Sequence, residues 1–275
     1  MTGHASERER GFALVSVLWA AMLLAVIVGT ILATGRSEAE LAHDRIRHAQ
    51  LEEVVEAALD IAVLRLLDPA PAHQPPADAA PFTVSFAGHA VRVSVQDEAG
   101  KIDLNFAQPE VLRRLLTSAG VDVEIAQGLV DKILDWREPG SLKRLNGAKA
   151  QDYARAGYPY GPRDGPFESV AELRLVMGMT PQIFAMIAPA LTVYSQSPWI
   201  DPELAPPPVL VALFGTAAAR AEEAARPRPS SAVRLGHAFT ITAETADAGN
   251  MRAFKTAVVR LTGSRAQPYW VYRWD

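Results

Sequence analysis

An uncharged stretch of 25 residues, Gly11–Gly35, follows a short charged stub at residues 1–10. A helix rises about 1.5 Å per residue, so this stretch is long enough to cross the roughly 30 Å hydrocarbon core of a bilayer. It exceeds the apolar region of a cleaved secretory signal, which has about 7–15 residues. The pattern therefore predicts a transmembrane helix over residues 12–35. Arg8 and Arg10 place the stub in the cytoplasm by the positive-inside rule.

The same helix is predicted to continue outside the membrane through residues 36–67. Apolar residues recur there at spacings of three and four, which is typical of a helix that buries one face. These apolar positions are Leu51, Val55, Leu59, Ala62 and Leu66. Asp68-Pro69 ends the helix, because the residue before a proline disfavours helical geometry.

Alternation of apolar and polar residues then predicts strands in two separate regions, residues 82–97 and 233–275. The first region predicts a hairpin that turns at Gly88-His89. The second predicts three strands joined by short turns, an antiparallel meander. Its last strand has aromatic residues at alternate positions, which favours a sheet core against the long helix over a binding platform. The aromatic residues are Trp270, Tyr272 and Trp274.

Residues 98–215, between the two strand regions, show helical periodicity and predict an inserted all-α domain. A faint internal repeat lies within it. Residues 102–115 match residues 200–213 at seven of fourteen positions without gaps. Both copies place a proline at or near a helix start, where its missing N–H is harmless. Duplication of one structural unit and chance matching of common residues both account for the repeat.

Composition excludes several kinds of site. The 275-residue chain has no cysteine, which rules out disulfides and thiolate metal sites, and its six histidines are scattered. Its net charge of −4 gives no electrostatic reason to expect a nucleic-acid partner. The sequence contains neither a GxSxG motif nor a P-loop, and no residue set suited to acid–base chemistry. We therefore do not expect an enzyme.

The junction between the stub and the apolar stretch resembles the prepilin-type leader that prepilin peptidase cuts. A plain signal anchor is the alternative interpretation. The resemblance implies cleavage between Gly11 and Phe12, followed by N-methylation of Phe12. Most pilin-like proteins carry a glutamate at the fifth position of the mature chain, where it pairs with the free N-terminus of the neighbouring subunit. Counted from Phe12, that position is Ser16, so this carboxylate is absent.

Four further segments extend the resemblance over nearly the whole chain. They are DEAGKIDLN (97–105), ILDWREPG (133–140), NGAKAQDY (146–153) and PFESVAELRLVMGMTPQIFAMIAPALTVYS (166–195). With the leader and the missing glutamate, they resemble the K-type minor pseudopilin of type II secretion systems. The resemblance implies an α+β fold, in which a pilin-like N-terminal transmembrane helix packs on an antiparallel sheet. It also implies that the inserted all-α domain is SAM- or helix-hairpin-helix-like.

In that family, the K subunit caps a short tip complex and starts assembly of the pseudopilus. The resemblance implies a single-pass protein of the bacterial inner membrane, with its N-terminus in the cytoplasm and its C-terminal domain in the periplasm. The implied partners are the I- and J-type minor pseudopilins, the major pseudopilin, the inner-membrane secretion platform and prepilin peptidase. A subunit without the glutamate at Ser16 fits the tip, because no neighbour above it needs that contact.

Members of the family often bind calcium through an acidic loop after an Asp-Trp pair and a downstream Gly-Ala-Glu-Asp. Here the pair at 135–136 is followed by Arg137, and the later acidic positions hold Lys149 and Ala150. Calcium takes six to eight oxygen ligands, so the site looks degraded and we expect no cofactor. The residues left as candidates for a weak calcium site are Asp135, Glu138 and Asp152.

The principal alternative function is a membrane-anchored nucleic-acid-binding module of a type IV pilus or DNA-uptake machine. The segment ELRLVMGMTPQIFAMI (172–187) resembles helix-hairpin-helix units, which hold a phosphate on backbone amides at a glycine-rich turn. Its turn has one glycine, Gly178, between two methionines. Arg174 is the only cation close to it in the sequence, so the segment is a weak candidate for phosphate binding.

Overall fold

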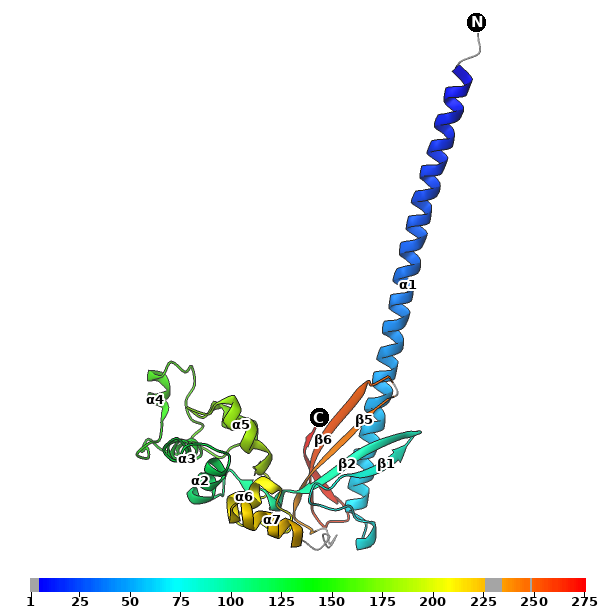
Figure 1. Ribbon diagram of the computed structural model, residues 1–275. Coiled ribbons are helices and arrows are strands. Elements are labelled where there is room, and N and C mark those ends of the chain that lie inside the picture. The colour runs from blue at the N-terminus through cyan, green and yellow to red at the C-terminus, as the bar shows by residue number, and fades with distance from the viewer. Residues whose placement is uncertain (1–4, 226–233, 248) are drawn as a thin grey trace.

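In a computed structural model, the structure describes residues 5–225, 234–247 and 249–275, without the side chains of 5–14, 29, 31–40 and 222–225. The helix α1, Ala5–Leu66, projects far from the rest of the molecule at its N-terminal end (Figure 1). Within the described residues, no helix is long and apolar enough to cross a membrane. Part of the predicted span over residues 12–35 has side chains that lie outside the description.

An antiparallel sheet of five strands packs against the C-terminal half of α1 (Figure 1). The strand order is β1-β2-β5-β6-β7, and β5, β6 and β7 form the predicted meander. The strands are β1 (Phe82–Phe86), β2 (His89–Asp97), β5 (Ala238–Ala246), β6 (Arg252–Leu261) and β7 (Tyr269–Trp274). A short 3₁₀ helix, η1 (Pro71–His73), lies in the proline-rich connection after α1. The predicted combination of helix and antiparallel sheet is confirmed.

The turn of the first hairpin lies one residue earlier than predicted. Ala87 and Gly88 both have positive φ angles, +48° and +81°, and His89 begins β2 opposite Phe86. Two consecutive positive φ angles are typical of the tight turns whose twist matches the flanking strands. His89 is therefore a strand residue beside the turn.

The long helix and the sheet share one hydrophobic core. The predicted stripe on α1 is buried, and Val55 and Leu59 are completely enclosed. Alternate residues of β2 and β5, such as Val93 and Ile241, point at this stripe from the sheet. The helical spacing of three to four and the strand spacing of two thus produce complementary apolar faces.

Replacing Leu59 by alanine is expected to lower the free energy of unfolding by about 2–5 kcal/mol, because the side chain leaves a cavity under the sheet. Leu64 is the matched control, since it lies on the same helix with 67% of its surface exposed. Leu64→Ala should change stability by less than about 0.5 kcal/mol. Urea denaturation followed by tryptophan fluorescence measures both variants. Equal effects would contradict the packing of α1 on the sheet.

The chain between the neighbouring strands β2 and β5 forms a helical domain, which lies to one side of the sheet (Figure 1). Its longer helices are α2 (Pro109–Ser118), α3 (Val123–Arg137), α4 (Ala150–Arg155), α5 (Pro181–Ile187), α6 (Pro207–Phe214) and α7 (Thr216–Ala225). Its shorter elements are η2 (Glu98–Gly100), β3 (Ile102–Asp103), η3 (Val170–Leu175), η4 (Ala188–Ala190) and β4 (Leu191–Thr192). The domain extends beyond the predicted end at residue 215, because Ala219 of α7 is buried in its core.

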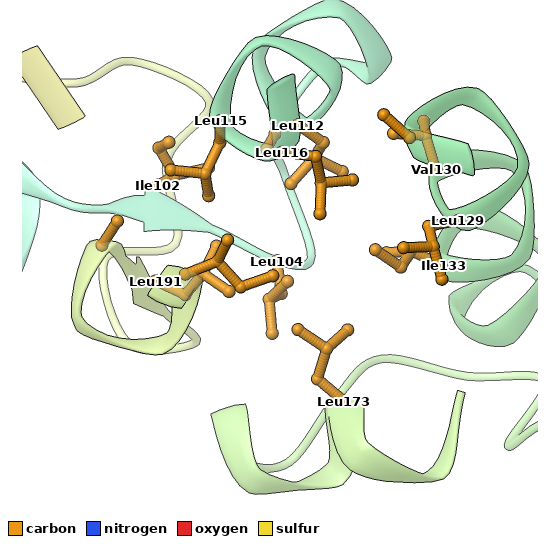
Figure 2. Close-up of a cluster of buried hydrophobic side chains, with 14 of the residues drawn as sticks. Ile102, Leu104, Leu112, Leu115, Leu116, Leu129, Val130, Ile133, Leu173 and Leu191 are labelled. Carbon is orange, nitrogen blue, oxygen red and sulfur yellow. The ribbon is translucent and has the colours of Figure 1, made fainter. Parts of the chain in front are cut away.

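The helical domain has a hydrophobic core of its own. Leucine, isoleucine and valine side chains from β3, α2, α3, η3 and β4 point toward one centre (Figure 2). The start of the domain is tied to the segment before α6, because β3 pairs in parallel with β4. The buried carboxylate of Asp103 reinforces this closure by accepting hydrogen bonds from the Ser195 hydroxyl and the Gln196 backbone N–H, at 3.0 and 2.8 Å.

The two copies of the sequence repeat adopt the same local structure. Asp103 and Asp201 each accept a hydrogen bond from the backbone N–H two residues later. Pro109 and Pro207 then begin α2 and α6, and these two helices pack against each other. The shared turn and helix start support duplication of one structural unit over a chance match.

The aromatic residues of β7 do not share one face, contrary to the prediction. Val259 pairs with Val271 whereas the preceding Val258 pairs with Arg273, so Tyr272 is an extra residue opposite this step. Such a bulge reverses the alternation of side chains. Trp274 packs toward the core with α1, whereas Trp270 and Tyr272 lie on the outer side, 55% and 45% exposed.

Candidate functional site

The residues predicted to direct processing and assembly lie in the projecting part of α1. The helix passes through Gly11 and Phe12 without a break, and their side chains lie outside the description. Ser16 lies on the exposed surface of the same helix. Large apolar side chains surround it, among them Leu18 and Trp19, which are 71% and 69% exposed. An exposed apolar surface of this kind is typical of a segment that packs against lipid or other chains.

The three candidate calcium ligands lie at the far end of the helical domain, around the end of α3 and the start of α4. Asp122 caps the N-terminus of α3 with its carboxylate, and Asp135 in the last turn is completely buried. Together with nearby basic residues, the candidates form a set of charged side chains that we call the 135–164 cluster. It consists of Asp135, Glu138, Lys143, Arg144, Lys149, Asp152 and Asp164.

Arg144 joins two of the three candidates. Its guanidinium donates hydrogen bonds to both carboxylate oxygens of Glu138, at 2.7 Å each, and to Asp135 Oδ1 at 3.0 Å. Its backbone N–H also points at the Asp135 carboxylate. Paired hydrogen bonds between a guanidinium and a carboxylate are among the strongest in proteins. The hydrogen bonds from Arg144 accordingly hold the pKa of Glu138 below its usual range.

Lys149 lies between the same residues and is almost fully buried. Its ammonium donates to the backbone carbonyls of Asp135 and Glu138 and to Asp164 Oδ1, each at 2.7 Å. The third candidate, Asp152, accepts from the Lys149 backbone N–H at 3.1 Å and from Lys143 Nζ at 3.0 Å. These two hydrogen bonds lower the pKa of Asp152.

The structure therefore brings Asp135 and Glu138 together through Arg144, and holds Asp152 separately through Lys143 and Lys149. Over the described residues, no group of three or more histidine or acidic side chains is arranged to hold a metal. The residues present do not fit a calcium ion, because side-chain N–H groups of Lys143 and Arg144 and backbone N–H groups already donate to the oxygens of the three carboxylates.

Sequence reasoning named Lys149 only as the replacement of an acidic residue, and it missed the other cations that complete this cluster. It placed Arg137 in the loop after the Asp-Trp pair. In the structure Arg137 is the last residue of α3, and its guanidinium donates to the carbonyls of Leu104 and Ala107, outside the cluster. Sequence reasoning did not assign Arg144 or Asp164 to the site. The one available signal was the basic composition of residues 143–149, directly after the acidic positions.

The candidate phosphate-binding hairpin has a different geometry from the prediction. Its first half, η3, is a 3₁₀ helix, and Gly178 at the turn has a φ of +90°. The guanidinium of Arg174 lies over the ring of Phe184 at 4.3 Å. Arg174 is not the only cation near the turn, because Lys132 Nζ would be 3.5 Å from a Cβ atom at Gly178. Lys132 lies on α3, far from Gly178 in the sequence, so nothing in the sequence indicated that the two are close in space.

Fold and site together define a class of protein in which a long helix packs on an antiparallel sheet and a helical domain is inserted in the chain between two neighbouring strands of that sheet. Residues 93–196, which cover most of the helical domain, match the family model described as type II secretion system protein K. Over this domain the chain is similar to the type II secretion system protein K family, the family that its sequence resembles.

Two comparisons with individual proteins show the same similarity. The chain is 28% identical over 144 residues to the type II secretion system protein K of Pseudomonas aeruginosa. The match covers 49% of this chain and 43% of that relative, so the chain spans less than half of the relative's length. A structure of the GspK-GspI-GspJ complex from the enterotoxigenic Escherichia coli type 2 secretion system has a similar fold. Its TM-score is 0.55 at 16% identity, over 87% of this chain and 98% of that one.

Proposed function

We propose that this chain is a minor pseudopilin that starts and caps the pseudopilus of a type II secretion system, for export of folded proteins across the outer membrane. The observation that carries the proposal is the helical domain inserted between β2 and β5. It lies beside the sheet, at the end of the molecule away from the N-terminus of α1 (Figure 1). A domain in that position obstructs the stacking of another subunit above, which suits a subunit at the tip.

The proposed anchor is the N-terminal part of α1. Residues 12–35 span the inner membrane, with the N-terminus in the cytoplasm and the sheet and helical domain in the periplasm. Prepilin peptidase cuts between Gly11 and Phe12, and Phe12 is then N-methylated. The uncharged sequence and the exposed apolar side chains around Ser16 support this proposal. Ser16 in place of glutamate supports a tip position, because that subunit has no neighbour above it.

The proposed partners are the I- and J-type minor pseudopilins at the tip, the major pseudopilin below them, and the inner-membrane platform. The similar solved structure supports the first two, since it is a structure of a GspK-GspI-GspJ complex. The nucleic-acid alternative has one observation in its favour, the position of Lys132 beside Gly178. Against it, Arg174 is engaged with Phe184 and the chain carries a net negative charge.

Co-expression with its own I- and J-type pseudopilins should yield a complex that co-purifies with the full-length chain in detergent. A matched preparation that lacks the J-type subunit tests whether both partners contribute. The same complex is titrated with a DNA duplex at low and high salt. Salt-dependent DNA binding without recovery of either pseudopilin would overturn the proposal and favour the nucleic-acid alternative.

A further inference from the structure

The ammonium of Lys149 occupies a site built from two other segments of the helical domain, the end of α3 and the loop that contains Asp164. An ammonium has three N–H donors. Here each donor has an oxygen at 2.7 Å, contributed by the carbonyls of Asp135 and Glu138 and by the carboxylate of Asp164. The Lys149 side chain is 9% exposed, so its charge is largely shielded from water. A buried charge is costly unless it is paired and hydrogen-bonded, and this one is both.

The site resembles the surroundings of a structural cation in two respects. Backbone carbonyls and a carboxylate are the oxygen ligands that calcium prefers. Counted with the neighbouring Arg155, which pairs with Asp152, the 135–164 cluster also has equal numbers of carboxylates and basic side chains. The carboxylates are Asp135, Glu138, Asp152 and Asp164, and the basic side chains are Lys143, Arg144, Lys149 and Arg155. A divalent ion added here would have to displace the N–H donors from these oxygens. It would also give the site a net positive charge.

Lys149 connects three segments that also meet in aromatic contacts. Tyr153 of α4 packs on Trp136 of α3 and on Tyr160 of the following loop. Asp135 and Glu138 lie at the C-terminal end of α3, and Lys149 is the N-cap residue directly before α4. Asp164 belongs to the following loop and has a φ of +53°, a conformation that residues other than glycine rarely adopt. The ammonium holds this loop to the end of α3, which helps to maintain that conformation.

A close approach of the backbone supports the same arrangement. Gly147 passes so near Asp135 that a Cβ atom at Gly147 would be 1.8 Å from the Asp135 Oδ2 atom. The loop before Lys149 is thus fitted tightly around the buried carboxylate that also binds Arg144. The loop that carries Lys149 and the end of α3 that binds its ammonium therefore pack closely together.

We propose that the ammonium of Lys149 takes the structural place of a metal ion in this domain, so that residues 135–164 fold around a cation supplied by the chain. The consequence is a helical domain whose stability does not depend on calcium. This inference concerns the domain alone and stands apart from the proposed role in secretion. Loss of the lysine should loosen the three segments together, and calcium should not restore them.

The full-length protein in detergent tests the proposal by its melting temperature in EDTA and in millimolar calcium. The wild-type Tm should be the same in both. Lys149→Met keeps most of the side-chain volume but removes the charge, and should lower the Tm by about 5–10 °C in either condition. Lys143→Met is the matched control, because Lys143 is 46% exposed and makes a single ion pair with Asp152. It should change the Tm by about 2 °C or less.

Hydrogen exchange measured by mass spectrometry locates the effect. In Lys149→Met, exchange should rise in residues 138–164, with little change in β5 and β6. A wild-type Tm that falls in EDTA, or saturable binding of radioactive calcium at micromolar concentration, would overturn the proposal. So would equal effects of the two lysine variants. The wild-type measurements decide the question even if Lys149→Met does not fold.

Discussion

Replacing Gly11 by alanine is expected to leave essentially the whole population of the chain uncut. The proposed peptidase must admit the backbone at this position without a side chain, and even a methyl group obstructs such an approach. Membrane insertion should persist, because the uncharged stretch after Gly11 is unchanged. Intact-mass analysis of the membrane fraction measures the result. The wild-type protein should lack residues 1–11 and carry one added methyl group, and the variant should show neither change.

Gly35→Ala is the matched control for this experiment. Gly35 lies at the other end of the same uncharged stretch, so the variant carries the same added methyl group away from the junction. Its processing should be normal. Normal maturation of Gly11→Ala would contradict the prepilin-type leader and leave a plain signal anchor as the better interpretation. The two interpretations are therefore separated by one pair of variants.

The parts of the fold that could be predicted are those determined by local periodicity. Residues such as Val55 and Leu59 recur at helical spacing, and the residues of β2 and β5 alternate, so the buried face of each element can be identified from its own sequence. The bulge at Tyr272 could not be identified in this way. It depends on how β7 pairs with β6, and a single extra residue moved Trp270 to the opposite face from Trp274.

The candidate calcium site shows a second limit of sequence reasoning. The acidic residues were found because their spacing is local, but their pairing with Arg144 and Lys149 was not predicted. Arg144 and Lys149 reach Asp135 only because the intervening loop folds back on α3. Oxygens arranged to bind a metal ion and oxygens arranged to bind an ammonium have similar chemistry. Only the spatial position of the cations distinguishes the two cases.

Replacing Gly100 by alanine is expected to destabilise the junction between the sheet and the helical domain by about 3 kcal/mol or more. A Cβ atom at Gly100 would lie 2.2 Å from the carbonyl oxygen of Leu204 and 2.8 Å from the Ala205 nitrogen. These are backbone atoms, so no side chain can rotate to relieve the contact. The same segments are joined by hydrogen bonds from Gln96 Nε2 to the Leu204 carbonyl and from the Asp201 N–H to the Ala99 carbonyl.

Gly165→Ala is the control for this effect, because a Cβ atom at Gly165 would meet its nearest atoms only at ordinary contact distances, 3.9–4.0 Å. It should change stability by less than about 0.5 kcal/mol. Urea denaturation of both full-length variants measures the difference. Hydrogen exchange should also rise in Gly100→Ala around residues 96–101 and 201–205, where the chain enters and leaves the domain. If the two variants are equally stable, the close approach of Gly100 to Leu204 does not hold the inserted domain against the sheet.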